Sequence, residues 1–282
     1  MDYNDARRMA DPSPGDRQKA IPYEEIRKHL CVDMVNTQSN ADLLAKAPHT
    51  GYEDMSMVYR VLIRNPQGES GRALITNELM ERMGVTREQL HEDALANSPL
   101  VRPAVIKDIR EVLGLVLDDG TPLEMCEPQM YVVTTTDMVW GCGAIFYPGF
   151  MDQCTETVGG GYYILPSSIH EVLLYPEDGG VNAKELQELV TNINAMEVAP
   201  EDQLSNSVYH YDPKERLFEL GAVFEERRDA LEAAALDGKV AEQAKPASVL
   251  DDLHDRQKDA GSRSRPTPTQ TQQKSSKNRA VL

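Results

Sequence analysis

Apolar residues follow two periods along this chain, and the two periods predict which segments are helices and which are strands. Apolar positions three or four apart indicate a helix, whereas alternating apolar positions indicate a strand. Up to Gly114 they predict, in order, a helix after Pro22 with Ile26, Leu30 and Met34 on one face, a short helix at Leu43 and Leu44, a strand over 57–63, a returning strand over 73–76, a helix from the cap Thr86 to Ala96, and a helix from Pro103 to Gly114. We expect Asn97, Ser98 and Pro99 to end the helix that Thr86 begins.

The second half of the chain contains more strand signals. The pattern predicts strands over Met130–Thr135 and Val139–Tyr147, a helix over 149–158, a strand over Tyr162–Leu165, a helix capped by Asn182 with Leu186, Leu189, Val190 and Ile193 inward, a hairpin of Val208–Tyr211 with Leu217–Leu220, a charged helix over 221–243 and a last short helix over 248–258. The stretch from Ser168 to Tyr175 fits both a short helix and an alternating strand. We favour the helix, because Glu171 would complete a capping box with Ser168.

Strand pairs with helices between them indicate an α+β protein whose mixed, largely antiparallel sheet is packed by helices. We expect a flexible leader over 1–20, an α+β body over 21–220 and a charged helical extension over 221–258. The body is either one extended unit or two closely joined halves that meet near 117–128. A disordered basic tail is predicted over 259–282, because this stretch has too few large apolar side chains to offset the entropy of ordering.

Charge is distributed unevenly between the body and the tail. Five of the 29 basic residues and none of the 46 acidic ones lie from Ser262 onward, which leaves 24 basic and 46 acidic residues before it and a net charge of −22. Such a body repels phosphate backbones and suits protein or cationic ligands. Nucleic acid is therefore an unlikely partner except through the tail, 262–282.

Cysteine spacing and hydropathy indicate the expected compartment. The four cysteines are too sparse for a disulfide scaffold and form no CxxC pair. No apolar run has the length of a membrane span, and the first residues lack the apolar stretch of a secretory signal. A cytoplasmic protein with reduced thiols, without a membrane partner, is the prediction. Its oligomeric state does not follow from the sequence.

The densest cluster of reactive side chains is Ser168, His170 and Glu171. A zinc-protease helix would need a second His four residues after His170, where Leu174 stands, so we predict no metal. A hydrolase that uses the three residues stays open as an alternative, although no GxSxG elbow is present and helix capping explains the serines. Gly159–Gly161 lacks the Lys-Ser/Thr of a phosphate loop, and no cofactor is predicted.

A second group of candidate ligand-binding residues follows that cluster. Alternation in the Tyr209–Tyr211 strand puts the two tyrosines on one face and His210 on the other. We expect a ligand pocket, if one forms, to be lined by His170, Glu171, Asn194 and Tyr209, because convergent polar groups in an apolar cleft are typical of such sites. The candidate ligand-binding residues are Ser168, His170, Glu171, Asn194, Tyr209 and Tyr211.

Three motifs carry a family resemblance: NADLLAKAPHTGYEDMSMVYRV, YYILPSSIHEVLLYPED and VAPEDQLS followed by SVYHYD. Over about 26–226 the chain resembles an uncharacterised bacterial family, catalogued as a domain of unknown function, that is frequent in gut Clostridia and found near mobile elements. The resemblance implies a cytoplasmic protein with no established activity. Fuller members carry additional structure before the position of Ile26, so an exposed sheet edge is expected here.

Because no active-site pattern is complete, an enzyme is not the favoured interpretation. We predict a non-catalytic cytoplasmic protein that binds a protein partner. The alternatives are the hydrolase named above and a mobile-element accessory that touches DNA through its basic tail.

Overall fold

A computed structural model of the chain describes residues 22–64, 70–115 and 129–243. The described residues up to Arg228 belong to one compact unit, and those from Asp229 onward belong to a second. The predicted leader, the short helix over 248–258, the basic tail and the predicted junction at 117–128 all lie outside the described residues. The domain boundaries therefore stay predictions.

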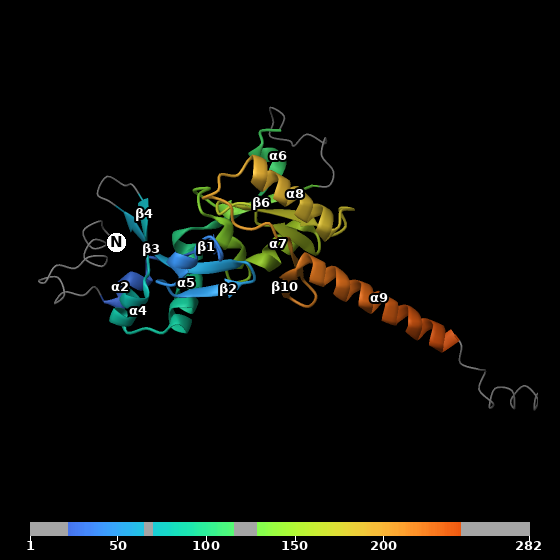
Figure 1. The fold of residues 1–282 in the computed structure, drawn as a ribbon, viewed down its shortest axis with the longest axis horizontal. Helices are drawn as coiled ribbons and strands as arrows, with labels where there is room; N and C mark the ends of the chain where they lie inside the picture. The colour runs from blue at the N-terminus through green and yellow to red at the C-terminus, as the bar shows by residue number, and fades with distance from the viewer. Residues whose placement is uncertain (1–21, 65–69, 116–128, 244–282) are drawn as a thin grey trace, which may run out of the picture. The chain divides into compact units, whose positions relative to one another are not determined.

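The elements confirm an α+β protein built from helices and antiparallel sheets (Figure 1). In chain order they are α2 (Tyr23–Arg27), β1 (Leu30–Asn36), α3 (Ala41–Leu44), β2 (His49–Tyr52), β3 (Met55–Arg64), β4 (Ser70–Leu74), α4 (Asn77–Met83), α5 (Arg87–Val101), β5 (Ala104–Asp108), α6 (Ile109–Val112), β6 (Tyr131–Thr135), the 3₁₀-helix η2 (Cys142–Phe146), α7 (Phe150–Val158), β7 (Tyr162–Leu165), β8 (Val172–Pro176), α8 (Ala183–Met196), β9 (Tyr209–Asp212), β10 (Leu217–Leu220) and α9 (Gly221–Gln243).

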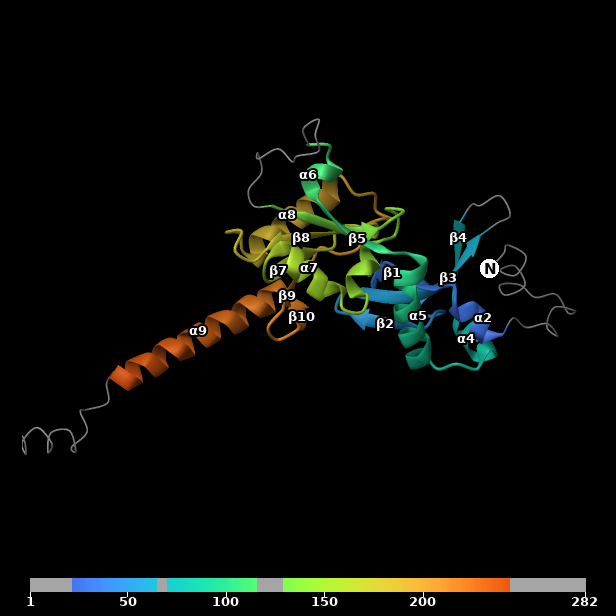
Figure 2. The ribbon, with the colours of Figure 1, turned by 180° about the vertical axis from the view of Figure 1, so that it is seen from behind.

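The first sheet has β3 at its centre. β1 pairs with one side of β3, while β2 and β4 pair with the two halves of its other side, all antiparallel. Helix α5 lies against β1 (Figure 2). Its Asn97 amide donates to the Leu30 carbonyl at 2.9 Å, and its Ser98 hydroxyl accepts from the Val32 N–H at 3.1 Å. These two bonds cover part of the strand edge that we expected to be exposed.

The second sheet has six antiparallel strands in the order β10-β9-β7-β8-β6-β5. Alternation along β7 divides its side chains between two cores. Tyr162 and Ile164 enter the larger core, whereas Tyr163 and Leu165 enter a smaller core with residues of α8. Both faces of this sheet are therefore buried along β7.

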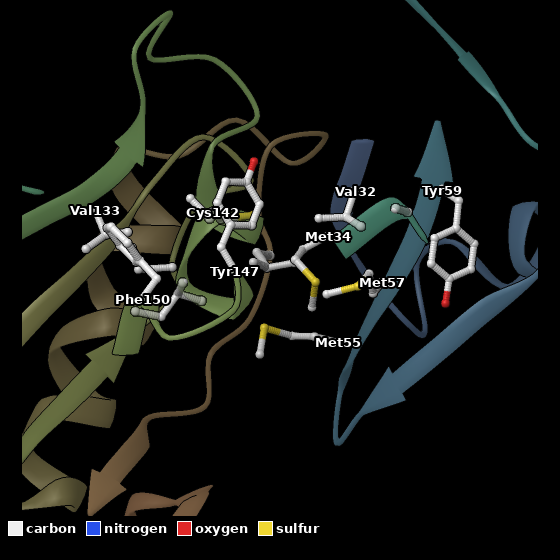
Figure 3. Close-up of a cluster of buried hydrophobic side chains, with 14 of the residues drawn as sticks. Val32, Met34, Met55, Met57, Tyr59, Val133, Cys142, Tyr147 and Phe150 are labelled. Carbon is white, nitrogen blue, oxygen red and sulfur yellow. The ribbon is translucent and has the colours of Figure 1, made fainter. Parts of the chain in front are cut away.

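The larger core joins the two sheets. Figure 3 shows Met34, Met55 and Met57 of the first sheet meeting Cys142 and Phe150 from the side of the second sheet. Methionine suits such a junction, because its unbranched, polarizable side chain fills irregular gaps. Since these residues are all buried, the sheets depend on the same packing.

Two predicted helices are wrong because their segments form strands. Residues Leu30–Asn36 are β1, and the helix that begins after Pro22 ends at Arg27. Pro103–Gly114 contains the strand β5 and only a four-residue helix, α6. In β1 the apolar residues also alternate, and pairing with β3 selects that period over the helical one.

Two further predictions name the wrong type of element, and one helix ends later than predicted. The predicted strand Val139–Tyr147 contains the 3₁₀-helix η2, and Ser168–Tyr175 contributes the strand β8 where we favoured a helix. Helix α5 continues to Val101 with Pro99 inside it, so the helix extends past the predicted stop although Pro99 has no N–H to donate. The strand β2 and the helix α4 were not predicted.

The remaining elements agree in type with the prediction. They are α3, β3, β4, α5, β6, α7, β7, α8, β9, β10 and α9. The cap at Thr86 is confirmed, and Asn182 with Glu185 forms a complete capping box at the start of α8.

Candidate functional site

A hollow of about 420 Å³ lies where the turn after β1 meets the chain that follows α8. Its lining is Asn36, Gln38, Ser39, Asn194, Pro200, Gln203, Leu204, Ser205 and Asn206. No lining residue carries a charge, although 27% of the residues in the chain do. The hollow is thus a neutral, hydrogen-bonding surface on an acidic protein.

Side-chain bonds fix the walls of the hollow. Asn36, the last residue of β1, donates from its Nδ2 to the Leu204 carbonyl at 2.9 Å, and its Oδ1 accepts from the Ser39 N–H at 2.9 Å. Ser205 donates from its hydroxyl to Asp54 at 2.7 Å. The walls therefore come from distant segments that are tied together by polar contacts.

Helix α8 places Asn194 in the hollow. Leu186, Val190 and Asn194 follow one another at intervals of four, so the buried stripe of the helix ends in an amide. The Asn194 Nδ2 donates to the Ser205 carbonyl at 2.9 Å and to Asn206 Oδ1 at 2.8 Å. These two donations fix which way the amide points.

The Asn194 Oδ1 accepts no hydrogen bond from the residues that the structure describes, although Asn194 is only 4% exposed. A buried acceptor without a donor costs about 1–3 kcal/mol. The Oδ1 atom itself is shielded from solvent, so a group in the hollow would reach it only if neighbouring side chains moved. The side-chain amides that line the hollow are therefore the feature that most directly indicates a ligand.

Other amides add to the hydrogen-bonding capacity of the hollow. Gln203 uses its Nε2 to donate to the Asn194 carbonyl at 2.7 Å and the Val198 carbonyl at 3.0 Å, which leaves its Oε1 as an acceptor. Gln38 and Asn206 are exposed, so their amide nitrogens can donate. The hollow therefore offers both donors and acceptors to one ligand.

The predicted Ser168, His170 and Glu171 are committed to other contacts or lie outside this hollow. The Ser168 hydroxyl accepts from the main-chain N–H of His170 at 2.9 Å. The His170 ring accepts at Nδ1 from the Trp140 N–H at 3.0 Å, and its Nε2 lies 3.4 Å from Asp202 Oδ1. Glu171 is half-buried directly before β8. It lines neither this hollow nor the smaller one beside Gly159–Gly161.

The Tyr209 and Tyr211 side chains both enter the larger core, as alternation predicted. Their hydroxyls donate to Asp54 Oδ1 at 2.5 Å and to Asp152 Oδ1 at 2.7 Å. Because Asp54 also accepts from Ser205, Tyr209 supports the wall of the hollow without lining it. Of the six candidate residues, Asn194 alone lines it.

His210 points to the opposite face of β9 and packs on Phe224, with ring centroids 3.4 Å apart. Burial lowers the pKa of His210 to about 4. Its Nε2 lies 3.3 Å from Glu177 Oε2, and burial raises the pKa of Glu177. Glu177 also lines a smaller hollow of about 230 Å³ beside Gly159–Gly161. The sequence pattern placed His210 on this face but gave no sign of Glu177 as its neighbour.

Within the described ranges, no three His, Cys, Asp or Glu side chains group closely enough to hold a metal ion. Within the same ranges, no helix has the length and apolar character to cross a membrane.

Fold and hollow together define an α+β protein with a neutral, amide-lined surface hollow. The chain belongs to DUF5688, a family of unknown function, whose model matches residues 3–213. This confirms the expected resemblance to a family without an established activity, and the match begins before Ile26. Neither the curated proteins nor the solved structures gave a significant match.

Proposed function

We propose that this protein is a non-catalytic binding protein, and that its ligand is an extended segment of a protein partner held in the amide-lined hollow. A hollow of about 420 Å³, whose lining offers side-chain amides and no charged residue, is the observation that carries the proposal.

A polypeptide main chain matches the chemistry of the lining. It presents neutral N–H and C=O groups in alternation, and side-chain amides can pair with both. An apolar ligand would leave the amides unpaired, which costs binding energy. A nucleic acid would meet no cation among the lining residues and a body of net charge −22.

The alternatives have weaker support. A hydrolase that uses Ser168, His170 and Glu171 would need the Ser168 hydroxyl beside the His170 ring, but that hydroxyl accepts from the His170 main chain. The DNA-binding alternative depends on 262–282, which lie outside the described residues. A cytoplasmic location and an association with bacterial mobile elements remain predictions from the sequence.

Selection from a displayed library of random peptides tests the proposal without knowledge of the partner. Peptides enriched on the wild-type protein are retested on Gln38→Arg, which places a bulky charge at the rim of the hollow. Gln187→Arg makes the same exchange on an exposed position of α8 and is the matched control. We expect Gln38→Arg to weaken binding at least about tenfold, or 1.4 kcal/mol, and Gln187→Arg to leave it unchanged.

Affinity capture from native host cells provides the second test. A stoichiometric protein should be retained by the wild type and by Gln187→Arg and lost with Gln38→Arg. Peptides that bind all three proteins equally, together with captures that retain nothing, would refute the proposal.

A further inference from the structure

A cluster of three arginines surrounds Asp33, a buried residue of β1. The Arg60 Nε lies 2.5 Å from Asp33 Oδ2, Arg72 bonds to Asp33 Oδ1, and the Arg102 Nη1 lies 3.6 Å from the same oxygen. The pairing register of the strands explains why Asp33, Arg60 and Arg72 lie together. Asp33 pairs with Val58, while Arg60 pairs with Leu74. The charged residues therefore lie diagonally across β1, β3 and β4 on one face.

Positive charge exceeds negative charge in this cluster. The charge of Arg102 is balanced by Asp137. The Arg102 Nη2 donates a hydrogen bond to the Asp137 Oδ1 at 3.0 Å. Arg60 and Arg72 share Asp33, which leaves one guanidinium charge without a carboxylate in the cluster. The contact of Arg60 Nε with Asp33 Oδ2 is an ion pair without hydrogen-bond geometry, since both atoms lack an aligned partner. An excess charge held this close to the core is costly unless an anion compensates it.

The loop after β6 brings exposed apolar surface to the cluster. Met138 and Trp140 have positive φ angles of 54° and 50°, which are unfavourable for residues other than glycine. The Arg102 Nη1 donates to the Trp140 carbonyl at 3.1 Å, and the Trp140 N–H donates to His170. The Trp140 ring, which is 42% exposed, lies over the Arg72 guanidinium at 3.6 Å. Met138 is 43% exposed.

Gly141 keeps this loop in place. A Cβ atom at this position would lie 2.2 Å from Thr134 Oγ1 and 2.5 Å from the Thr135 nitrogen. Only glycine fits so close to another main chain. The strained position of Trp140 is thus fixed from both sides, by Arg102 and by the His170 segment. Backbone strain that the surroundings enforce in this way is characteristic of functional sites.

We propose that Arg60, Arg72 and Trp140 form a binding site for a small organic carboxylate with an aromatic or apolar group. The fork of an arginine matches a carboxylate in geometry, and one uncompensated positive charge suits a singly charged anion. The Arg60 side chain is 21% exposed, so its terminal nitrogens are within reach of a ligand. Burial lowers the pKa of Arg72, Asp33 raises it in part, and the neighbouring Arg102 and Arg60 lower it further, so a second anion would counter the remaining effect.

Benzoate is the probe, because it joins a carboxylate to an aromatic ring. Trp140 is the one tryptophan of the chain, so tryptophan fluorescence reports directly on the site. A titration at constant ionic strength, balanced with chloride, should give a saturable change with a dissociation constant of about 1 mM or lower. Benzamide, which has the same shape without the charge, should give no saturable change.

Variants locate the site. Arg60→Gln should weaken benzoate binding at least about tenfold, whereas Arg82→Gln, which removes an exposed charge from α4, should leave the affinity unchanged. Arg60→Lys keeps the positive charge beside Asp33 but loses the planar guanidinium group that can bind a carboxylate through two nitrogens. This variant should fold and should bind benzoate more weakly than the wild type. Circular dichroism confirms the fold of each variant.

Four outcomes would overturn the proposal. They are an absence of saturation with benzoate, an equal response to benzamide, an equal loss of affinity in Arg82→Gln, and binding of inorganic phosphate in place of benzoate. The proposed site shares no residue with the amide-lined hollow. Its failure would therefore leave the peptide-binding proposal standing, and the reverse holds too.

Discussion

Three buried tyrosines of this protein direct their hydroxyls to carboxylates. Tyr209 donates to Asp54, Tyr211 to Asp152 and Tyr163 to Glu225. In each case the ring fills the core while the hydroxyl reaches a polar rim, as the amphipathic shape of tyrosine allows. A carboxylate that loses such a donor keeps its charge in a partly desolvated place. These bonds are therefore expected to contribute more than an ordinary surface hydrogen bond.

Replacing Tyr209 by Phe tests this expectation. The ring stays in the core, but Asp54 loses its 2.5 Å donor, so we expect the free energy of unfolding to fall by about 1–3 kcal/mol. Urea denaturation measures the change. Tyr52→Phe is the matched control, because the Tyr52 hydroxyl makes no hydrogen bond in the described structure, and it should change stability by less than about 0.5 kcal/mol. Equal losses in both variants would contradict the role given to the Asp54 bond.

His210 should make stability depend on pH. Burial lowers its pKa from 6.5 to about 4, so between these values the unfolded chain binds more protons and stability falls as the pH falls. The loss is on the order of 3 kcal/mol at most. Asp212 raises this pKa, while Arg227 and Arg228 lower it. The raised pKa of Glu177 acts in the opposite direction and reduces the net loss.

Urea denaturation of His210→Phe between pH 7 and pH 4 measures this contribution. The stack on Phe224 is kept and the titration is removed, so the slope of stability against pH should flatten. Tyr52→Phe should keep the wild-type slope, because tyrosine does not titrate in this range. A slope in His210→Phe as steep as that of the wild type would show that other groups cause the dependence.

The sequence located part of the site at the residue scale. Asn194 stands out because it continues the spacing of Leu186 and Val190, so an amide occupies a buried position. Gln38 and Gln203 give no such signal, since they approach Asn194 only through tertiary contacts. The closeness of Ser168 and His170 in sequence suggested a catalytic pair. In the structure the Ser168 hydroxyl accepts from the main-chain N–H of His170 and does not bond to the His170 ring.

At the scale of elements, the caps at Thr86 and Asn182 were predicted correctly, whereas the capping box expected of Ser168 and Glu171 does not begin a helix. The caps at Thr86 and Asn182 are both present, because each satisfies main-chain donors locally. The segment Ile26–Met34 fits a helix by its four-residue spacing and a strand by its alternation. The choice between them depends on pairing with β3, which lies some 25 residues later. Local sequence does not contain that information.

Two asparagines of α8 should respond to alanine in opposite ways. Asn182, the cap before Ala183, accepts the Glu185 N–H with its side chain, and Asn182→Ala removes that acceptor, so we expect a loss of about 1 kcal/mol in the free energy of unfolding. Asn192→Ala, at an exposed position inside the same helix, should raise it by a few tenths of a kcal/mol, because alanine is the better helix former. Chemical denaturation distinguishes the two. Changes of the same sign would mean that the capping box contributes little.

At the scale of the whole molecule, one core couples the two sheets. Its members come from strands whose separation in sequence exceeds a hundred residues, as with Met57 and Ile164. The sequence indicated either one unit or two joined halves and could not choose between them, because apolar patterns show which face is buried and not what it faces. Because both sheets bury their apolar side chains in this shared, methionine-packed junction, we expect neither sheet to be stable alone.

Met57→Ala tests this coupling. Met57 is fully buried between the sheets, so its truncation should cost about 2–5 kcal/mol. Trp140 fluorescence reports the contact between the loop after β6 and Arg72 of the first sheet, and far-ultraviolet circular dichroism reports all secondary structure. Both should show one transition that shifts equally to lower urea. Met196→Ala, at a position 72% exposed at the end of α8, should shift neither. If the dichroism instead fell in two steps, the sheets would unfold separately, and the chain would consist of two halves.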